Sequence, residues 1–146
     1  MKEFTITKAC SEDYTKLIQV WEASVRATHH FLNEADILSY KKLILQKYFD
    51  QVNLYCIKEH HAIQGFLGLS GDTIQMLFIH PDQRGKGIGK RFVEFAIAEN
   101  NVNKVDVNEQ NEQAVGFYKH LGFVITERFE NDDAGKPYPV LAMELK

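Results

Sequence analysis

Glycines and cations are concentrated in one short segment, residues 84–91, which reads RGKGIGKR. It follows an apolar run that ends at Ile79 and precedes an amphipathic run that contains Phe92 and Val93, so we expect it to join a strand to a helix. Glycine lets the backbone approach a ligand closely, and the first turn of a helix presents unpaired N–H groups at the positive end of its dipole. In a chain with a formal net charge of −3, the four cations of this segment predict a local site for an anion such as pyrophosphate.

Three other interpretations of this segment are weaker. A P-loop requires GxxxxGK followed by Ser or Thr, but here Arg91 follows the lysine. A dinucleotide fingerprint requires GxGxxG, whereas Gly85, Gly87 and Gly89 are spaced two residues apart. A tight turn that binds nothing would account for one glycine, but not for three glycines with four cations. The remaining pattern is RxxGxG, which begins at Arg84.

A second informative segment, residues 111–123, reads NEQAVGFYKHLGF and fits the pattern N-x-x-A-x-x-F-Y-x-x-x-G-F. Together with RxxGxG, this segment resembles the GNAT superfamily of N-acetyltransferases, whose pyrophosphate loop is Q/R-x-x-G-x-G/A. The resemblance holds in order and spacing from about Thr73 to Phe123. The segments WEASVRATHHFL and DDAGKPYPVL are similar to a small bacterial subgroup, the YjaB-like acetyltransferases. With those segments the resemblance covers nearly the whole chain.

The resemblance implies a co-substrate, acetyl-CoA, and no metal. In the GNAT fold the strand before the loop splays from its parallel neighbour, and the pantetheine arm binds in the gap. Here that strand ends in Leu77, Phe78 and Ile79, and the neighbour covers Val105–Asn108. The N–H of Phe78 or Ile79 would polarise the thioester carbonyl, and Asn111 would contact the cofactor arm. The loop residues implied to hold the pyrophosphate are Arg84, Gly85, Lys86, Gly87, Ile88, Gly89 and Lys90.

Tyr118 is the candidate general acid, because it matches the tyrosine that protonates the departing thiolate in many GNAT enzymes. A phenol with a pKa of about 10 suits this role at neutral pH. The alternative is that Tyr118 is a core aromatic residue like its neighbour Phe117. Adjacent helical residues point about 100° apart, so we expect the two rings to face different ways.

The sequence leaves the general base open. His29 and His30 follow the first predicted helix, where GNAT relatives line the acceptor cleft, and either imidazole could accept a proton near neutral pH. Adjacent histidines near a helix end are also common as solvated or capping groups, and a water chain could replace a side-chain base. Candidate substrate-binding residues are therefore His29, His30 and Asn108, with weaker grounds for Glu34, His80, Glu109 and Tyr138.

Periodicity supplies the elements that would position these residues. The predicted order is β-α-α-β-β-β-α-β-α-β-β, an α/β (α+β) GNAT fold with a mixed, mostly antiparallel sheet of six to seven strands and about four helices on its faces. Ser11 is expected to cap the first helix, and Asn33 the second. The predicted strands are Phe4–Thr7, Leu54–Glu59, Ile63–Ser70, Thr73–Ile79, Val105–Val107, Phe123–Phe129 and Val140–Leu145. A helix over Asn111–Leu121 is expected to end at Gly122.

Composition limits the class of protein. With 146 residues, 45% hydrophobic and 25% charged, we expect a single globular domain over residues 1–146. Cys10 and Cys56 show neither zinc spacing nor a disulfide framework, and Cys56 lies in an apolar run typical of a packed core. No basic stripe, signal sequence or apolar run of membrane-spanning length is evident. We therefore expect a cytoplasmic protein with no nucleic-acid or membrane partner, and the resemblance to a bacterial subgroup implies a bacterial source.

Two questions of function stay open at this point. The implied activity is transfer of an acetyl group from acetyl-CoA to a primary amine by direct attack on the thioester, but a non-catalytic acyl-CoA-binding regulator would keep the same loop. The acceptor, a small molecule or a protein amine, is not identified, and the short acidic patches at Glu34–Asp36 and Asn131–Asp133 resemble ordinary solvated surface. A monomer or a homodimer is equally compatible with the sequence.

Overall fold

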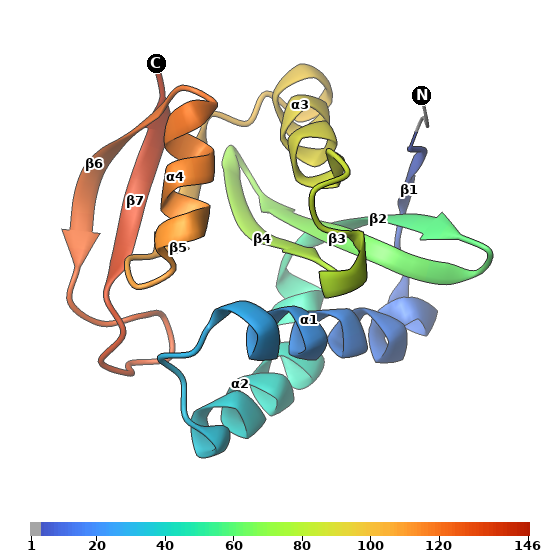
Figure 1. Cartoon of the computed structure of the whole chain (residues 1–146), viewed down its shortest axis with the longest axis horizontal. Coiled ribbons are helices and arrows are strands. Elements are labelled where there is room, and N and C mark those ends of the chain that lie inside the picture. Colours follow the sequence, from blue (N-terminus) through green and yellow to red (C-terminus); the bar gives the residue numbers. More distant parts are fainter. Residues whose placement is uncertain (1–3) are drawn as a thin grey trace.

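The computed structural model describes residues 4–146, which form one seven-stranded sheet with helices on both faces (Figure 1). The strand order across the sheet is β1-β2-β3-β4-β5-β7-β6. The strands are β1 (Ile6–Lys8), β2 (Asn53–Glu59), β3 (Ala62–Ser70), β4 (Thr73–Ile79), β5 (Lys104–Asn108), β6 (Phe123–Phe129) and β7 (Val140–Leu145). The helices are α1 (Tyr14–Thr28), α2 (Glu34–Gln46), α3 (Ile88–Asn100) and α4 (Glu112–His120), with short 3-10 turns at Ser11–Asp13, Tyr48–Gln51 and Pro81–Gln83. This order of elements confirms the predicted fold.

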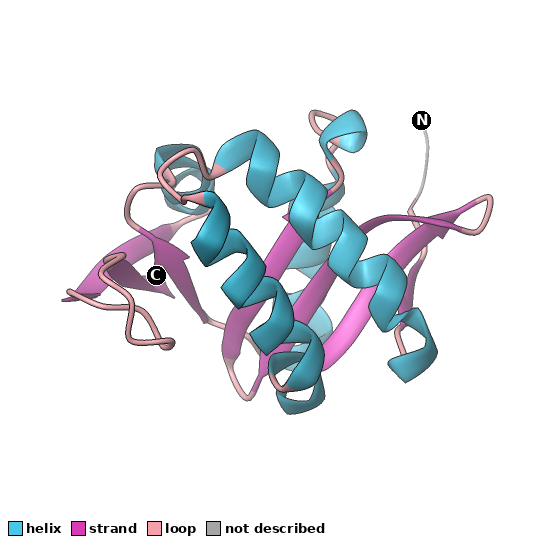
Figure 2. Ribbon diagram, turned by 90° about the horizontal axis from the view of Figure 1, so that it is seen from below, coloured by secondary structure: helices cyan, strands magenta, loops and turns pink. Residues whose placement is uncertain are grey.

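The sheet separates two hydrophobic cores. Helices α1 and α2 cover one face, seen from below in Figure 2, and bury Leu17 and Trp21 against Phe66. Helices α3 and α4 lie over the other face, where Phe92 and Tyr118 belong to the second core. Strand side chains alternate between the two cores because successive residues of a strand point to opposite faces.

Cys56 shows this alternation within β2. Its side chain is fully buried in the α1–α2 core, whereas that of its neighbour Ile57 is buried on the opposite face. The thiol is free, and burial raises its pKa. The prediction that Cys56 is a packed core residue is therefore confirmed.

Two helix starts were predicted from capping residues, and one of them is wrong. The first helical segment is capped by Cys10 and not by Ser11: the Cys10 N–H donates to the Asp13 carboxylate at 3.0 Å, and a 3-10 turn precedes α1. An acid three residues after the cap satisfies the cap backbone, so a Ser side chain is not needed. At α2 the prediction is confirmed, since the Asn33 side chain accepts from the Asp36 N–H at 2.8 Å.

Strands β4 and β5 run parallel and diverge soon after they meet. Their register pairs Thr73 with Lys104 and Ile74 with Val105, and no further pair joins them within residues 4–146. β4 nevertheless continues to Ile79, paired with β3 on its other side. The backbone of β4 beyond Ile74 therefore turns an unpaired edge toward the gap beside β5. β4 and β5 therefore splay apart after Ile74 and Val105, as the GNAT resemblance implies.

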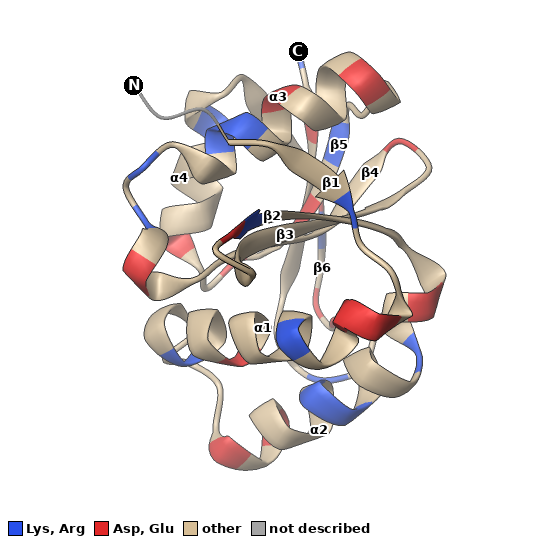
Figure 3. Cartoon of the chain, turned by 90° about the vertical axis from the view of Figure 1, so that its right-hand side faces the viewer, with Lys and Arg blue, Asp and Glu red and all other residues tan. Residues whose placement is uncertain are grey.

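Several boundaries differ slightly from the predicted ones. The first strand begins at Ile6, so Phe4 and Thr5 lie outside it, and β5 begins one residue earlier and ends one residue later than Val105–Val107. Gly122, with φ of 102°, ends α4 in a left-handed conformation as predicted. No helix within the described residues is long and apolar enough to cross a membrane. Acidic and basic residues are interspersed on the face seen in Figure 3, with no continuous basic stripe.

Candidate active site

A cavity of about 1210 Å³ opens where β4 and β5 diverge. Its lining comes from α1 and α2, from the ends of β4 and β5, from the loop before α3, from α4, and from the connection between β6 and β7. Elements distant in sequence therefore meet at one site. The cavity is large enough for an extended ligand and a second reactant.

The glycine loop forms one part of this lining. Gly85 and Gly87 adopt left-handed conformations, with φ of 79° and 84°, and Gly87 is the N-cap of α3. From Gly85 to Lys90 no backbone N–H has a hydrogen-bond acceptor among residues 4–146. Free donors at the start of a 13-residue helix form an anion site, because the helix dipole adds to their partial charges.

Close packing against α4 explains the third glycine of the loop. A Cβ atom at Gly89 would lie 3.3 Å from the Cζ atom of Phe117, a tight contact that would require the Phe117 ring to shift by a few tenths of an ångström, so glycine suits the close approach of α3 to α4. Arg84 donates to Gln113 of α4, which ties the loop to that helix. The first turn of α3 and the side of α4 are thus held together at the cavity wall.

Most of the predicted site residues line the cavity. Those that do are Leu77, Phe78, Ile79, Arg84, Gly85, Gly87, Ile88, Gly89, Lys90, Asn108, Asn111, Tyr118 and His29. Lys86 does not, because its Nζ atom turns back to the Gln83 side chain at 3.0 Å. His30 is exposed and also lies outside the lining.

Three of the weaker candidates are occupied elsewhere or lie at the surface. Glu109 pairs with Arg128, with its Oε2 atom 2.6 Å from the guanidinium Nε, and lies outside the cavity. Glu34 pairs with Arg26. The Nδ1 atom of His80 accepts from the Asp82 N–H at 3.1 Å and starts a 3-10 turn. None of these three side chains lines the cavity.

Tyr118 lies at the cavity wall with its ring packed between two other aromatic rings. The ring centroids of Phe117 and Phe123 lie 5.1 and 5.6 Å away, and only 5% of the residue is exposed. Among residues 4–146 no group is hydrogen-bonded to its hydroxyl. Burial raises the pKa of this phenol, so it stays protonated at neutral pH. A buried, protonated and unpaired phenol at a cavity wall is able to donate a proton to a ligand there.

Asn111 has a structural role besides its place on the lining. Its side-chain oxygen accepts from the Ala114 N–H at 3.2 Å and caps α4. The amide N–H₂ group of Asn111 is therefore the part of this side chain that is left for a ligand.

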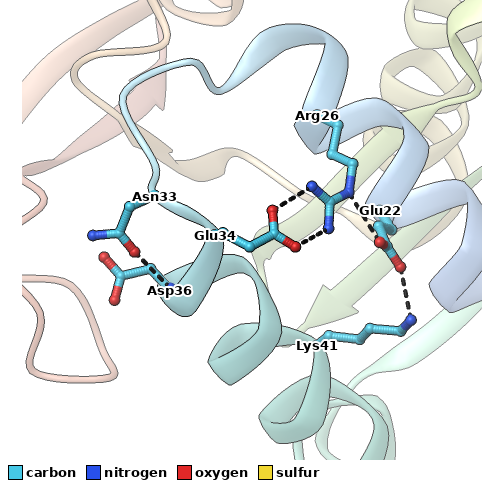
Figure 4. A network of polar contacts seen from close by, with 6 residues as sticks. All are labelled: Glu22, Arg26, Asn33, Glu34, Asp36 and Lys41. Atoms are coloured by element: carbon cyan, nitrogen blue, oxygen red, sulfur yellow. Dashed lines mark hydrogen bonds and ion pairs between the residues drawn. The ribbon is translucent and has the colours of Figure 1, made fainter.

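The turn between α1 and α2 brings His29 to the cavity, and a charged network fixes that turn (Figure 4). Arg26 of α1 contacts both carboxylate oxygens of Glu34, at 2.7 and 2.8 Å, and also Glu22 at 2.9 Å. Lys41 of α2 pairs with Glu22 at 2.7 Å. Single exposed ion pairs contribute little, but a bidentate pair in a network restrains the geometry of the turn.

The connection between β6 and β7, residues 130–139, folds back against α2 and the α1–α2 turn (Figure 1). Tyr40 donates to Asp132, and Tyr138 donates to Asp36, whose carboxylate also pairs with Lys136 at 3.2 Å. The hydrogen bond from Tyr138 and the pair with Lys136 lower the pKa of Asp36. These contacts close one side of the cavity with a segment that looks like a plain surface loop in the sequence.

Sequence reasoning missed the acidic character of this side of the cavity. Asp132 and Asp133 line the cavity, and so does Asp106 of β5. Asp106 is an exposed residue on the cavity wall, but partial desolvation raises the pKa of its carboxyl group, with a smaller contribution from Asp133 and an opposing one from a hydrogen bond with Gln75. Neither Asp106 nor Asp133 has a cationic partner in the described part of the chain. No local signal joins Asp106 to Asp133, because they meet only through the pairing of β5 with β7.

Comparison with known proteins places the chain in a family. Residues 19–145 match the family model described as the acetyltransferase (GNAT) domain. The chain is 43% identical over 137 residues to the peptidyl-lysine N-acetyltransferase YjaB of Salmonella typhimurium, covering 93% of this chain and 94% of that one. The chain belongs to the GNAT family of acetyltransferases.

Two further comparisons agree with the GNAT assignment. YjaB of Escherichia coli is 41% identical over 138 residues, covering 94% of this chain and 93% of that one. The solution structure of apo-form YjaB from Escherichia coli superposes with a TM-score of 0.87, at 39% identity over 98% of this chain and 97% of that one. This GNAT protein is therefore an enzyme, an N-acetyltransferase, and the reading as a non-catalytic acyl-CoA-binding regulator is set aside.

Proposed function

We propose that this GNAT enzyme transfers the acetyl group of acetyl-CoA to the side-chain amine of a lysine in a peptide or protein. The observation that carries the proposal is a single cavity with a cation-rich, amide-lined part at Arg84 and Lys90 and an acidic part at Asp106 and Asp133. The first suits the phosphates of coenzyme A, and the second suits a lysine ammonium group. YjaB relatives that carry the name peptidyl-lysine N-acetyltransferase agree with this acceptor.

The residues of the donor part fit coenzyme A. Free N–H groups from Gly85 to Lys90 would hold the pyrophosphate, with Arg84 and Lys90 adding charge. Backbone groups of Leu77–Ile79, which turn an unpaired edge toward β5, would bind the pantetheine amides in the manner of an added strand. Acetyl-CoA supplies the acetyl group as a thioester, an activated acyl donor.

Two features would assist transfer at the reacting end of the donor site. The N–H of Phe78 or Ile79 would stabilise negative charge on the thioester oxygen. Tyr118 would donate its phenolic proton to the departing sulfur, since its hydroxyl is protonated and has no partner among residues 4–146. The rings of Phe117 and Phe123 hold the Tyr118 ring in place at the cavity wall.

The acidic part of the cavity supports a cationic acceptor. Partial desolvation and the charge of Asp133 both disfavour the ionised form of Asp106, and a hydrogen bond with Gln75 offsets part of their effect. A lysine ammonium group beside these carboxylates would relieve both effects. Tyr40 and Tyr138 add aromatic faces that suit the aliphatic stem of a lysine side chain.

A two-part experiment tests the proposal. In a thermal-shift titration, acetyl-CoA and CoA should raise the melting temperature, whereas ATP and NAD should not. Mass spectrometry of a lysine-containing peptide incubated with enzyme and acetyl-CoA should then find N-acetyl-lysine. A matched peptide with arginine in place of lysine is the control. Stabilisation by acetyl-CoA with acetylation of polyamines or free amino acids only would overturn the lysine acceptor while retaining the donor site.

The enzyme is further proposed to work in the bacterial cytoplasm. The free thiols of Cys10 and Cys56 and the bacterial sources of the YjaB relatives support this location. Fractionation of cells that express a tagged protein would test it.

A further inference from the structure

His29 is a buried histidine whose two ring nitrogens lie in different surroundings. Its Nδ1 atom lies 2.7 Å from the hydroxyl of Thr28, at the end of α1. Its Nε2 atom has no hydrogen-bond partner among residues 4–146, although only 7% of the residue is exposed and the residue lines the cavity. Among residues 4–146 the only fully enclosed side-chain polar atoms without a partner belong to Asn100 and Asn103, so the Nε2 atom of His29 is accessible from the cavity that this residue lines and can accept a hydrogen bond from a ligand there.

The Thr28 hydroxyl decides which nitrogen carries the proton. This hydroxyl donates its single hydrogen to the carbonyl oxygen of Ser24, one turn back in α1, at 2.8 Å. Its contact with His29 must then be one in which the hydroxyl accepts, so Nδ1 carries the hydrogen. In a neutral imidazole the other nitrogen holds the lone pair. The chain from Ser24 through Thr28 to His29 therefore leaves the Nε2 atom as an acceptor.

The surroundings of His29 also keep the ring neutral. Burial lowers its pKa to about 4, with a smaller contribution from His30, the one charged or titratable group of residues 4–146 that affects it. Its ring contacts Phe31, with centroids 5.3 Å apart, and Phe78 of β4, at 6.4 Å. Phe78 belongs to the strand end that is proposed to hold the thioester. His29 therefore lines the same cavity as the strand end that is proposed to hold the thioester, with its ring beside that of Phe78.

We propose that Thr28 acts as a positioning residue that locks His29 in the Nδ1–H tautomer, and that the Nε2 atom of His29 takes the proton of the acceptor amine during acetyl transfer. The inference rests on the proposed function of the cavity. The amine nitrogen forms a bond to the acetyl carbon, the carbon–sulfur bond breaks, and the amine proton passes to Nε2. Tyr118 protonates the sulfur, and solvent then returns a proton from His29 to Tyr118.

A buried neutral imidazole is suited to this step and not to deprotonation of free lysine. Lysine in water, with a pKa of about 10.4, would not give its proton to a weak base. As the carbon–nitrogen bond forms, however, the amine nitrogen becomes strongly acidic, and a nearby lone pair is then enough to accept its proton. Before that, the same lone pair would accept a hydrogen bond from the neutral amine and orient it.

The tautomer is directly measurable by long-range ¹H–¹⁵N NMR correlation of the histidine rings, in the absence of any substrate. For the wild type we expect the Nδ1–H pattern at His29 and no titration between about pH 6 and pH 8. Thr28→Val removes the hydroxyl at nearly constant volume and should shift His29 toward the Nε2–H form, whereas Thr28→Ser should restore the wild-type pattern. An Nε2–H pattern in the wild type, or an unchanged pattern in Thr28→Val, would overturn the proposal.

Activity supplies the second readout. Loss of one ordinary hydrogen bond changes the tautomer ratio by about two- to twelvefold. The kcat of Thr28→Val should follow the population of the Nδ1–H tautomer and fall by no more than that factor, with KM for acetyl-CoA unchanged. Thr28→Ser should recover kcat. Thr7→Val is a matched control, because it removes a hydroxyl of β1 that contacts the Cys56 carbonyl of β2 at 3.5 Å, and neither residue lines the cavity. His29→Gln should lose roughly 10²-fold in kcat.

The results separate this inference from the proposed function. If the wild type acetylates no lysine peptide, the proposed function fails whatever the tautomer is. If the wild type acetylates lysine and His29→Gln or Thr28→Val does so at the wild-type rate, the proton-accepting role of His29 is refuted and the proposed function stands. Melting temperatures of all variants show whether a loss of activity reflects unfolding.

Discussion

Removal of one hydroxyl group, by Tyr118→Phe, should separate chemistry from folding in this enzyme. The Tyr118 hydroxyl has no hydrogen-bond partner among residues 4–146, so its removal leaves no other group unsatisfied. The free energy of unfolding should therefore change by less than about 1 kcal/mol. The ring itself, packed between Phe117 and Phe123, is unchanged. A general acid contributes about 10²–10⁴-fold, and because a thiolate is a fair leaving group we expect a loss of roughly 10²-fold in kcat.

The assay is release of the coenzyme A thiol at saturating lysine peptide, with acetyl-CoA varied. For Tyr118→Phe, KM for acetyl-CoA should stay within about twofold of the wild-type value, because the phosphates are bound elsewhere on the lining. The raised pKa of the phenol predicts no loss of wild-type kcat between about pH 7 and pH 9 from ionisation of this group. A variant with wild-type kcat, or one whose loss lies wholly in KM, would refute the role of Tyr118 as acid.

Three further predictions concern stability and motion. The lowered pKa of His29 means that the unfolded state binds more protons than the folded state between about pH 4 and 6.5. The contribution of His29 to the free energy of unfolding is therefore full above pH 6.5 and falls by about 2 kcal/mol at pH 5. Urea unfolding above pH 6.5 and at pH 5 should show this loss in the wild type and not in His29→Gln. Gly87→Ala should lower the free energy of unfolding by about 1 kcal/mol, because φ is 84° at this position. Gly116→Ala, in α4 with open space around its Cβ position, should raise the free energy of unfolding by about 0.5–1 kcal/mol. Equal effects of the two substitutions in thermal unfolding would contradict this interpretation of the loop. Tyr138→Phe removes the hydrogen bond to Asp36, so amide hydrogen exchange should become faster in residues 130–139 but not in β3. Unchanged exchange in residues 130–139 would show that this hydrogen bond does not hold the connection between β6 and β7 in place.

The order of elements could be predicted because each depends on short-range signals. The apolar spacing of α1, the alternation along β2 and β3, and Gly122 after α4 are all readable within a dozen residues. The N-cap of the first helical segment was missed because Cys10 is not a residue that usually caps helices, and the acid that satisfies its backbone lies three residues on. The usual preference for Ser at the N-cap therefore predicted Ser11, one residue after the observed cap.

The donor half of the site was predicted more fully than the acceptor half, for a physical reason. The loop from Arg84 to Lys90 is contiguous, so its glycines and charges can be recognised together. The acceptor half joins α1, α2, β5 and residues 130–139, and contacts such as the one between Tyr138 and Asp36 span 102 positions of sequence. The neutrality of His29 likewise depends on burial by Phe31 and Phe78, which no local pattern reports.

The central claim is that one cavity brings acetyl-CoA and a lysine side chain together for transfer. The most direct measurement is mass spectrometry of a lysine peptide incubated with acetyl-CoA and either the wild type or Tyr118→Phe, each shown by thermal shift to bind acetyl-CoA. The account predicts N-acetyl-lysine with the wild type and roughly 10²-fold less of it with the variant over the same time. Peptide that stays unmodified by a wild type saturated with acetyl-CoA would contradict the claim.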